Sequence, residues 1–368
     1  MKPIEVTSVI ADQDYIFGIF TTIAPQQAKN ICMIHEKRVS LCQFVGKTDK
    51  MPIHCIMLKA RHKDLHPLLK AAEWLLIMVV CTAVVFALWQ VLPIHHASTG
   101  ALLLLQALQA IGLFIVPAIV VAYLWSERPL EWLRIADSRK SKAESRKTGR
   151  LVLLSIGIML TALPLINLLV SWNEQIRLPE SLRGLEQLMQ QMEAQANQLL
   201  QQFLTYQNGA WWVLLLNLLV LAVLPAIGEE LTFRGVLQQL LYGQPSNPQT
   251  LKPSNPQTLK PSNPHLAVWV TAFIFSFIHF QFYGFIPRLL LGALLGYALL
   301  WSGNIRYSMI MHGTNNALSV LLFYLGTYVW DMSQEQIDAL GTEHTWWLTL
   351  VCTPLMILQI YAFRRVVR

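Results

Sequence analysis

Charged residues are scarce in this chain of 368 residues: they make up 13% of it, against 54% for hydrophobic residues. Soluble globular domains contain about 25% charged residues. A chain with so little charge cannot cover a water-facing surface. The shortage therefore excludes an ordinary soluble domain and indicates a protein that lies in a membrane.

Cysteine is also sparse, and its arrangement excludes further classes of site. The five cysteines are odd in number and scattered, and no CxxC pair occurs. A thiolate metal centre or a disulfide framework is therefore not expected. The HExxH sequence of many zinc hydrolases is absent as well.

The net charge of +7 does not indicate a nucleic-acid partner. The basic residues flank apolar runs, which is typical of cytoplasmic loops in membrane proteins. They are not interleaved with aromatic residues as in proteins that bind single strands. We expect membrane lipid as a partner and no nucleic acid.

Long apolar runs are what the chain has in abundance. A bilayer core requires about 20 apolar residues per helix. We predict an all-α fold, a polytopic transmembrane helical bundle of about eight spans. The predicted spans are Ala71–Leu92, Ala101–Trp125, Leu151–Ser171, Trp211–Leu241, Leu266–Phe282, Phe285–Trp301, Tyr307–Leu325 and Trp346–Phe363.

The distribution of charge predicts the orientation. The stretch 126–150 carries eight Lys or Arg residues against four acids, whereas 326–345 carries four acids and no Lys or Arg. Basic loops stay in the cytoplasm. Eight spans with both termini in the cytoplasm satisfy this pattern, and we expect a multi-pass protein of a bacterial inner membrane.

These spans and loops divide the chain into four regions. Residues 1–56 are interpreted as a poorly defined extension, dispensable and upstream of a start at Met57. Residues 57–210 form an N-terminal transmembrane half with an outer amphipathic helix at 180–205. Residues 211–326 hold a core with polar motifs and a repeat loop at 244–264, where SNPQTLKP occurs twice. Residues 327–368 supply an outer loop and the last span.

The outer helix has an apolar stripe at spacings of three and four residues, which is a heptad pattern. One interpretation is a lid or a dimer contact on the outer face. The favoured interpretation is a helix that lies on the membrane surface or packs on the bundle. The stripe comprises Leu182, Leu185, Met189, Met192, Ala196, Leu199 and Phe203.

The first polar motif is Glu229-Glu230 with Arg234 in the fourth predicted span. Ionisable residues inside spans cost about 2.5–3.5 kcal/mol each and are functional candidates. Glu230 and Arg234 are four residues apart and can pair on one helix face, whereas Glu229 is turned about 100° away. The alternative is a Glu–Arg pair that only marks the end of the span.

Two further motifs lie on later spans. Phe275 and His279 share a helix face, and His312 shares one with Asn316. An asparagine can donate to a developing oxyanion. Read alone, either motif could be a structural hydrogen-bonding group between helices.

Together, a carboxylate, two histidines and an amide can activate water and stabilise a tetrahedral intermediate. Glu229, His279 and His312 are also a ligand set that one divalent metal, zinc, could use. Such a metal would have to be held across three helices.

The three motifs in this order resemble the CPBP family, which contains the type II CAAX prenyl proteases and the bacterial Abi proteins. The resemblance covers Trp211–Leu325. It implies an intramembrane endopeptidase, described as a metalloprotease in some schemes and as metal-free in others.

By this resemblance the catalytic residues are Glu229, Glu230, His279, His312 and Asn316, supported by Arg234 and Phe275. Glu229 and His279 would activate water, and His312 and Asn316 would stabilise the oxyanion. The substrate would be a membrane-associated or lipidated peptide or protein. The alternative function is a non-catalytic membrane immunity or scaffold protein that uses the same polar cluster for packing.

Overall fold

The computed structural model describes residues 59–95, 97–135, 142–242, 263–333, 336–337, 339–342 and 345–368. The expected extension at 1–56, and all of the repeat loop up to residue 262, lie outside these residues. The described residues all belong to one compact unit, from Lys59 to Arg368.

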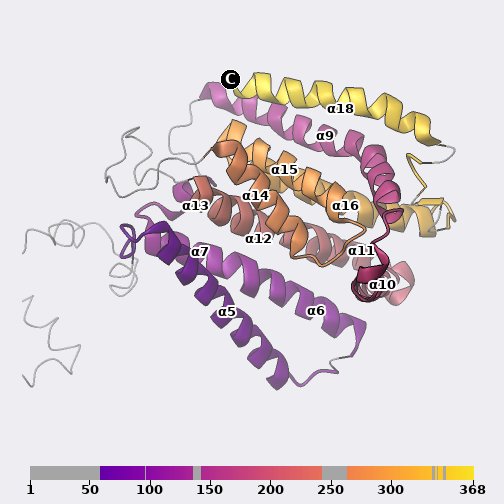
Figure 1. The fold of residues 1–368 in the computed structure, drawn as a ribbon, viewed down its shortest axis with the longest axis horizontal. Coiled ribbons are helices and arrows are strands. Elements are labelled where there is room, and N and C mark those ends of the chain that lie inside the picture. The colour runs from indigo at the N-terminus through magenta and orange to yellow at the C-terminus, as the bar shows by residue number, and fades with distance from the viewer. Residues whose placement is uncertain are drawn as a thin grey trace, which may run out of the picture. The chain divides into compact units, whose positions relative to one another are not determined.

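Every regular element in the described residues is helical, as Figure 1 shows. The N-terminal half contains Pro67–Val91 (α5), Thr99–Gln109 (α6), Ala110–Ile115 (η2), Val116–Trp125 (α7), Pro129–Trp132 (α8), Lys142–Glu174 (α9), Glu180–Leu182 (η3), Arg183–Leu204 (α10) and Tyr206–Gly209 (η4). The C-terminal half contains Trp211–Asn217 (α11), Leu218–Val223 (η5), Leu224–Glu230 (α12), Leu231–Leu237 (η6), Gln238–Tyr242 (α13), Pro264–Phe277 (α14), Phe285–Ser302 (α15), Ile305–Tyr328 (α16) and Trp346–Val367 (α18).

The all-α polytopic bundle is confirmed. Six helices in the described residues are long and apolar enough to cross a membrane: Pro67–Val91, Thr99–Trp125, Lys147–Glu174, Trp211–Tyr242, Phe285–Ser302 and Trp346–Val367. α14 is apolar but has only 14 residues, and α16 has 24 residues with polar groups in its middle. Both lie within the bundle, so eight crossings stay a prediction.

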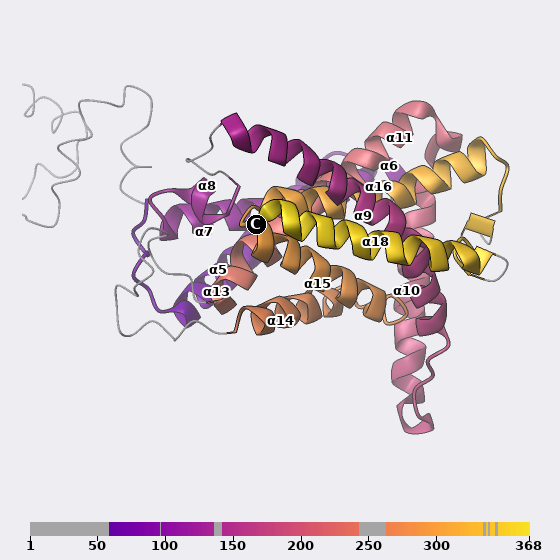
Figure 2. The same cartoon turned by 90° about the horizontal axis from the view of Figure 1, so that it is seen from above.

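The long helices run back and forth between two ends of this unit (Figures 1 and 2). α18 ends at one of them, beside the start of α9 (Figure 1). Its last turn carries Arg364 and Arg365, so we call this the basic end. α10 lies at the opposite end, which we call the α10 end. Figure 2 shows α10 running across the direction of the long helices and past them.

α10 is buried in the bundle only at its last turn. Phe203 is buried against Leu103 and Val220, and Leu204 is buried against Val320 and Phe323. Most of the preceding turns are exposed. The predicted helix at 180–205 is therefore present, broken at its start into η3 and α10.

Close helix contacts in the C-terminal half depend on glycine. A Cβ placed on Gly292 of α15 would lie 3.2 Å from Phe275 and 3.3 Å from Ala272 of α14. Gly296 follows one turn later and meets Val268 in the same way. This Gly-xxx-Gly spacing lets two helices approach closely in a membrane protein, and it holds α14 and α15 side by side.

Replacement of Gly292 by valine should therefore lower the thermal unfolding midpoint of the purified protein in detergent. The added methyl groups overlap Phe275 and Ala272, and overpacking of a buried contact costs about 1–3 kcal/mol. Gly149→Val is the matched control, because a Cβ at Gly149 of α9 meets no atom within 4 Å. Equal midpoints for the two variants would show that the α14–α15 contact does not require glycine.

Candidate active site

The helix that carries the glutamate pair is widened on both sides of it. η5 and η6 are π-helical turns, and α12 between them ends at Glu230. The N–H of Leu224 bonds the carbonyl of Leu219, five residues earlier, just before Pro225. Such wide turns occur frequently at functional sites in helices. They place the two carboxylates at the end of a short α-helical segment between two irregular turns.

Glu230 and Arg234 form the buried pair that their spacing predicts. Nη1 of Arg234 donates to Oε1 of Glu230 at 2.7 Å, and neither side chain has exposed surface. Nη2 of Arg234 donates to the carbonyl of Gly292 at 2.9 Å. The guanidinium therefore links the glutamate helix to α15.

Phe275 packs at the centre of these contacts. Its ring lies 4.6 Å below the guanidinium of Arg234 and 5.2 Å from the ring of Phe233. The rings of His279 and His312 meet it edge to face, at 5.0 Å and 5.7 Å between centroids. A cation over an aromatic face is attracted to it, so Phe275 holds the cation and both histidines in place.

His312 is almost completely buried and is oriented by Glu230. Its Nδ1 lies 2.9 Å from Oε1 of Glu230. A carboxylate paired with arginine can only accept, so Nδ1 carries the proton and donates it. In the neutral ring, Nε2 then presents a lone pair, and it lies 3.7 Å from Oε2 of Glu229.

His279 is oriented in the same sense by the backbone. It lies two residues beyond the end of α14, and its Nδ1 donates to the carbonyl of Phe275 at 2.7 Å. A carbonyl accepts only, so the Nε2 of the neutral ring again carries a lone pair. That Nε2 lies 4.0 Å from Oε2 of Glu229.

Three helical segments thus bring Glu229, His279 and His312 to one place. The sequence predicts an offset of about 10 Å between the two histidines along the bundle, from their distances to the helix ends. Both imidazoles reach the same carboxylate oxygen.

Asn316 lies one turn beyond His312 on α16 and faces the glutamate helix at a different level. Its Nδ2 donates to the carbonyl of Leu221 at 3.4 Å, and its Oδ1 accepts from Asn315 at 3.3 Å. Both bonds are long, so the amide is held loosely. A stronger acceptor could replace the Leu221 carbonyl at Nδ2.

The donor types of Glu229, His279 and His312 suit zinc, but their spacing in this structure does not. Tetrahedral zinc with bonds of about 2.0–2.1 Å needs ligand atoms about 3.4 Å apart. The two separations here are 3.7 Å and 4.0 Å. No group of three or more His, Cys, Asp or Glu residues in the described part of the chain is arranged to hold a metal ion.

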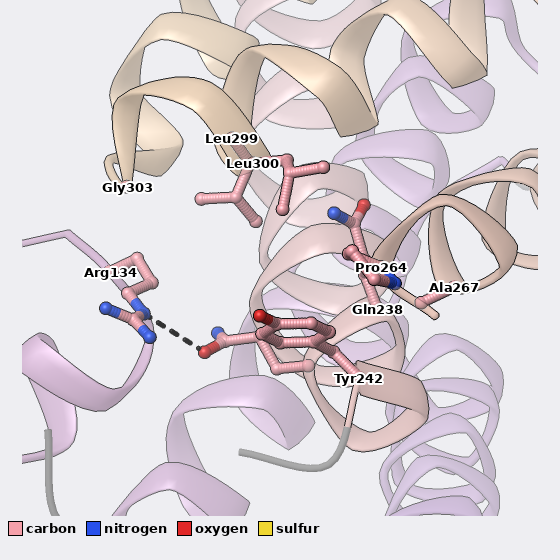
Figure 3. Close-up of a pocket in the computed structure, with 9 residues that line it drawn as sticks. Arg134, Gln238, Tyr242, Pro264, Ala267, Leu299, Leu300 and Gly303 are labelled. Atoms are coloured by element: carbon pink, nitrogen blue, oxygen red, sulfur yellow. Dashed lines mark hydrogen bonds between the residues drawn. The ribbon is translucent and has the colours of Figure 1, made fainter. Parts of the chain in front are cut away.

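A cavity of about 190 Å³ lies at the basic end, away from this cluster (Figure 3). Its polar wall includes Arg134, whose Nε donates to Gln239 at 3.3 Å, and Tyr242. Leu299 and Leu300 form an apolar wall. None of the glutamates or histidines of the motifs lines it.

Sequence reasoning missed Arg288, a cation near the start of α15. Its Nη2 donates to Oε1 of Gln281 at 2.6 Å. It is close enough to Glu229 to interact with it electrostatically. The signal was available, because Arg288 is an ionisable residue within a predicted span.

Removal of the guanidinium in Arg234→Met should destabilise the protein strongly. Loss of one partner of a buried ion pair leaves an uncompensated charge and costs about 3–5 kcal/mol. We expect a large drop in the thermal unfolding midpoint. Arg183→Met removes the exposed partner of Glu180 and should change the midpoint little. A small effect of Arg234→Met would mean that Glu230 is not held by this pair.

Comparison with known proteins bears on the same part of the chain. A family model described as type II CAAX prenyl endopeptidase Rce1-like matches residues 210–318. Searches of curated proteins and of solved structures gave no match. The matched stretch runs from the start of α11 into α16 and contains all three polar motifs. Residues 210–318 of this chain therefore match the type II CAAX prenyl endopeptidase Rce1-like family, which supports the resemblance to the CPBP family.

Proposed function

We propose that the protein is an intramembrane endopeptidase that hydrolyses a peptide bond of a membrane-associated or lipidated substrate. The observation that carries the proposal is the approach of two imidazole Nε2 atoms to one carboxylate oxygen, at 3.7 Å and 4.0 Å. The alternative, a scaffold that uses the cluster only for packing, would favour direct hydrogen bonds between these groups.

The two separations are too long for direct hydrogen bonds and suit a water molecule between the groups. Glu229 and His279 keep 15% and 28% of their side-chain surface exposed, so a water molecule and a peptide could reach them. His312 is nearly closed off at 5%. Water activation is therefore assigned to Glu229 and His279.

In the proposed step, Glu229 takes a proton from the water, and the oxygen attacks the carbonyl carbon of the peptide bond. The carbonyl oxygen becomes an oxyanion. The proton then passes to the amide nitrogen as the C–N bond breaks, which releases an amine and a carboxylic acid. A positioned acid–base group contributes about 10²–10⁴-fold to such a reaction.

The oxyanion would be stabilised from α16. Nδ2 of Asn316 can exchange its long bond to Leu221 for a shorter one to the charged oxygen. Nε2 of His312 can donate only when its ring carries both protons, because Nδ1 already donates to Glu230. Glu230 would then favour the doubly protonated ring by its negative charge.

Were zinc bound, Glu229, His279 and His312 would be its ligands, and it would polarise the carbonyl and the water. The separations in this structure are wider than tetrahedral zinc requires, so the step above is assigned to the side chains alone. Glu230 and the Phe275 carbonyl would orient the imidazoles in either case.

The substrate class is proposed from the family. A peptide with a prenylated C-terminal CAAX sequence is the substrate that the family description implies, and a lipid anchor would keep such a peptide at the membrane. The basic end would face the cytoplasm, because Lys and Arg concentrate in its loops. The α10 end would then face outwards.

The Glu229→Gln and His279→Ala variants should separate an enzyme from a scaffold. The wild-type protein in liposomes should cleave a fluorogenic farnesylated CAAX peptide, and each variant should lose about 10²–10⁴-fold in kcat/KM while its unfolding midpoint persists. Cleavage is followed by the increase in fluorescence and by mass spectrometry of the products.

Glu131→Gln is the matched control, since Glu131 pairs with Arg128 near the surface of the basic end. It should cleave as the wild type does. Retention of cleavage by Glu229→Gln, or loss of fold in both site variants, would favour the scaffold.

A further inference from the structure

α10 has a continuous apolar arc that the bundle covers only at one end. In a helix, residues 185, 188, 192 and 203 project within about 60° of one direction. Phe203 is buried in the bundle. Leu185, Leu188 and Met192 are 47%, 51% and 36% exposed. The same arc is therefore buried in protein at the end of α10 and largely exposed further back.

The direction of this arc is fixed by Phe203. The helix runs across the direction of the long helices and past them (Figure 2). Phe203, in its last turn, is buried against Leu103 and Val220 of the bundle. Where α10 passes beyond the bundle, the arc must point in the same direction, alongside the apolar spans. The medium that surrounds those spans therefore contacts Leu185, Leu188 and Met192.

A belt of tryptophans marks the level of the membrane surface at this end. Such residues collect where the headgroups meet the acyl chains. They lie at the ends of α9 and α16 and at the starts of α11 and α18. The exposed members are Trp172, Trp211, Trp212, Trp330, Trp346 and Trp347.

We propose that α10 lies in the lipid headgroup boundary at the α10 end, with Leu185, Leu188 and Met192 in contact with acyl chains. The opposite face is rich in glutamine, so the contact depends on buried apolar area and little on anionic lipid. A second copy of the chain would be the competing occupant of this arc.

The same helix holds the loop that carries His279. Glu193 accepts from the backbone N–H of Tyr283 at 3.1 Å, and Gln190 donates to the hydroxyl of Tyr283 at 2.9 Å. Asn173 of α9 donates to the carbonyl of Phe282 at 2.8 Å. Gln190 and Glu193 therefore connect the lipid-bound helix α10 to Tyr283, which lies four residues after His279.

The lipid contact is tested with spin labels on single cysteines in a chain whose native cysteines are replaced by alanine. The protein is placed in phosphatidylcholine nanodiscs. Labels at Leu185→Cys and Met192→Cys should collide more with oxygen, which dissolves in lipid, than with a water-soluble nickel chelate. Labels at Gln187→Cys and Gln198→Cys, on the glutamine face, are the controls and should show the reverse.

Preference for the nickel chelate at both apolar positions would overturn the proposal, because the arc would then face water. Broadening of the spectrum by a second label at close range would also overturn it, because a second copy would occupy the arc. Each position is a separate variant, so failure of one to fold leaves the other to decide.

The connection to the loop is tested by hydrogen exchange in the same nanodiscs. Glu193→Ala should raise the exchange rate of amides in 280–284, whereas Glu186→Ala on the same helix should not. Replacement of Leu185, Leu188 and Met192 by glutamine should give the same increase, while α15 keeps its protection.

Unchanged exchange in 280–284 in both cases would show that α10 does not hold the loop. The spin-label and exchange measurements need no substrate, so their failure is distinct from a failure to cleave peptides.

Discussion

The buried pair of Glu230 and Arg234 is the interaction on which the polar site depends. It places two opposite charges in an apolar environment where neither has exposed surface. The same two side chains also fix three neighbours. Arg234 donates to the carbonyl of Gly292 and lies over the ring of Phe275, and Glu230 accepts from Nδ1 of His312. Breaking the pair would release three helices at once, because each of these neighbours belongs to a different one.

In this arrangement the two adjacent glutamates have different roles, one structural and one available for reaction. Glu230 is fully enclosed and paired, whereas the adjacent Glu229 keeps part of its surface open and faces two imidazoles. Adjacent residues on a helix differ by about 100° in direction. One carboxylate can therefore be committed to structure while its neighbour stays available to a substrate.

Much of this was accessible from the sequence. The i, i+4 spacing of Glu230 and Arg234 predicts their pairing, and apolar runs predict the six helices that are long and apolar enough to cross a membrane. The convergence of Glu229 with His279 was expected from the joint occurrence of the motifs and from the family resemblance. It could not be derived geometrically, because helix positions along the chain do not give their relative depth. The bond from the His279 ring to the Phe275 carbonyl depends on where α14 ends, which its apolar sequence does not mark.

Other features carried no readable signal. The contacts of Tyr283 with α10 join residues about 90 positions apart, and a heptad stripe alone does not distinguish lipid, bundle or partner as its occupant. α16 was predicted as a span, yet its central polar residues keep it from qualifying by apolarity. Here the residues that build the site are the ones that weaken the membrane signal.

The π-helical turns on either side of the glutamate pair have a consequence for how related chains should be aligned. Each wide turn accommodates one residue more than an α-helical turn, while the helix before and after it keeps its facing. A relative could lack one residue within 218–223 or 231–237, close the turn to a regular one, and still present its carboxylates in the same direction. A gap of one position in either of these two windows is therefore compatible with an intact site. A gap inside 224–230 would instead turn the glutamate side chains away from the histidines.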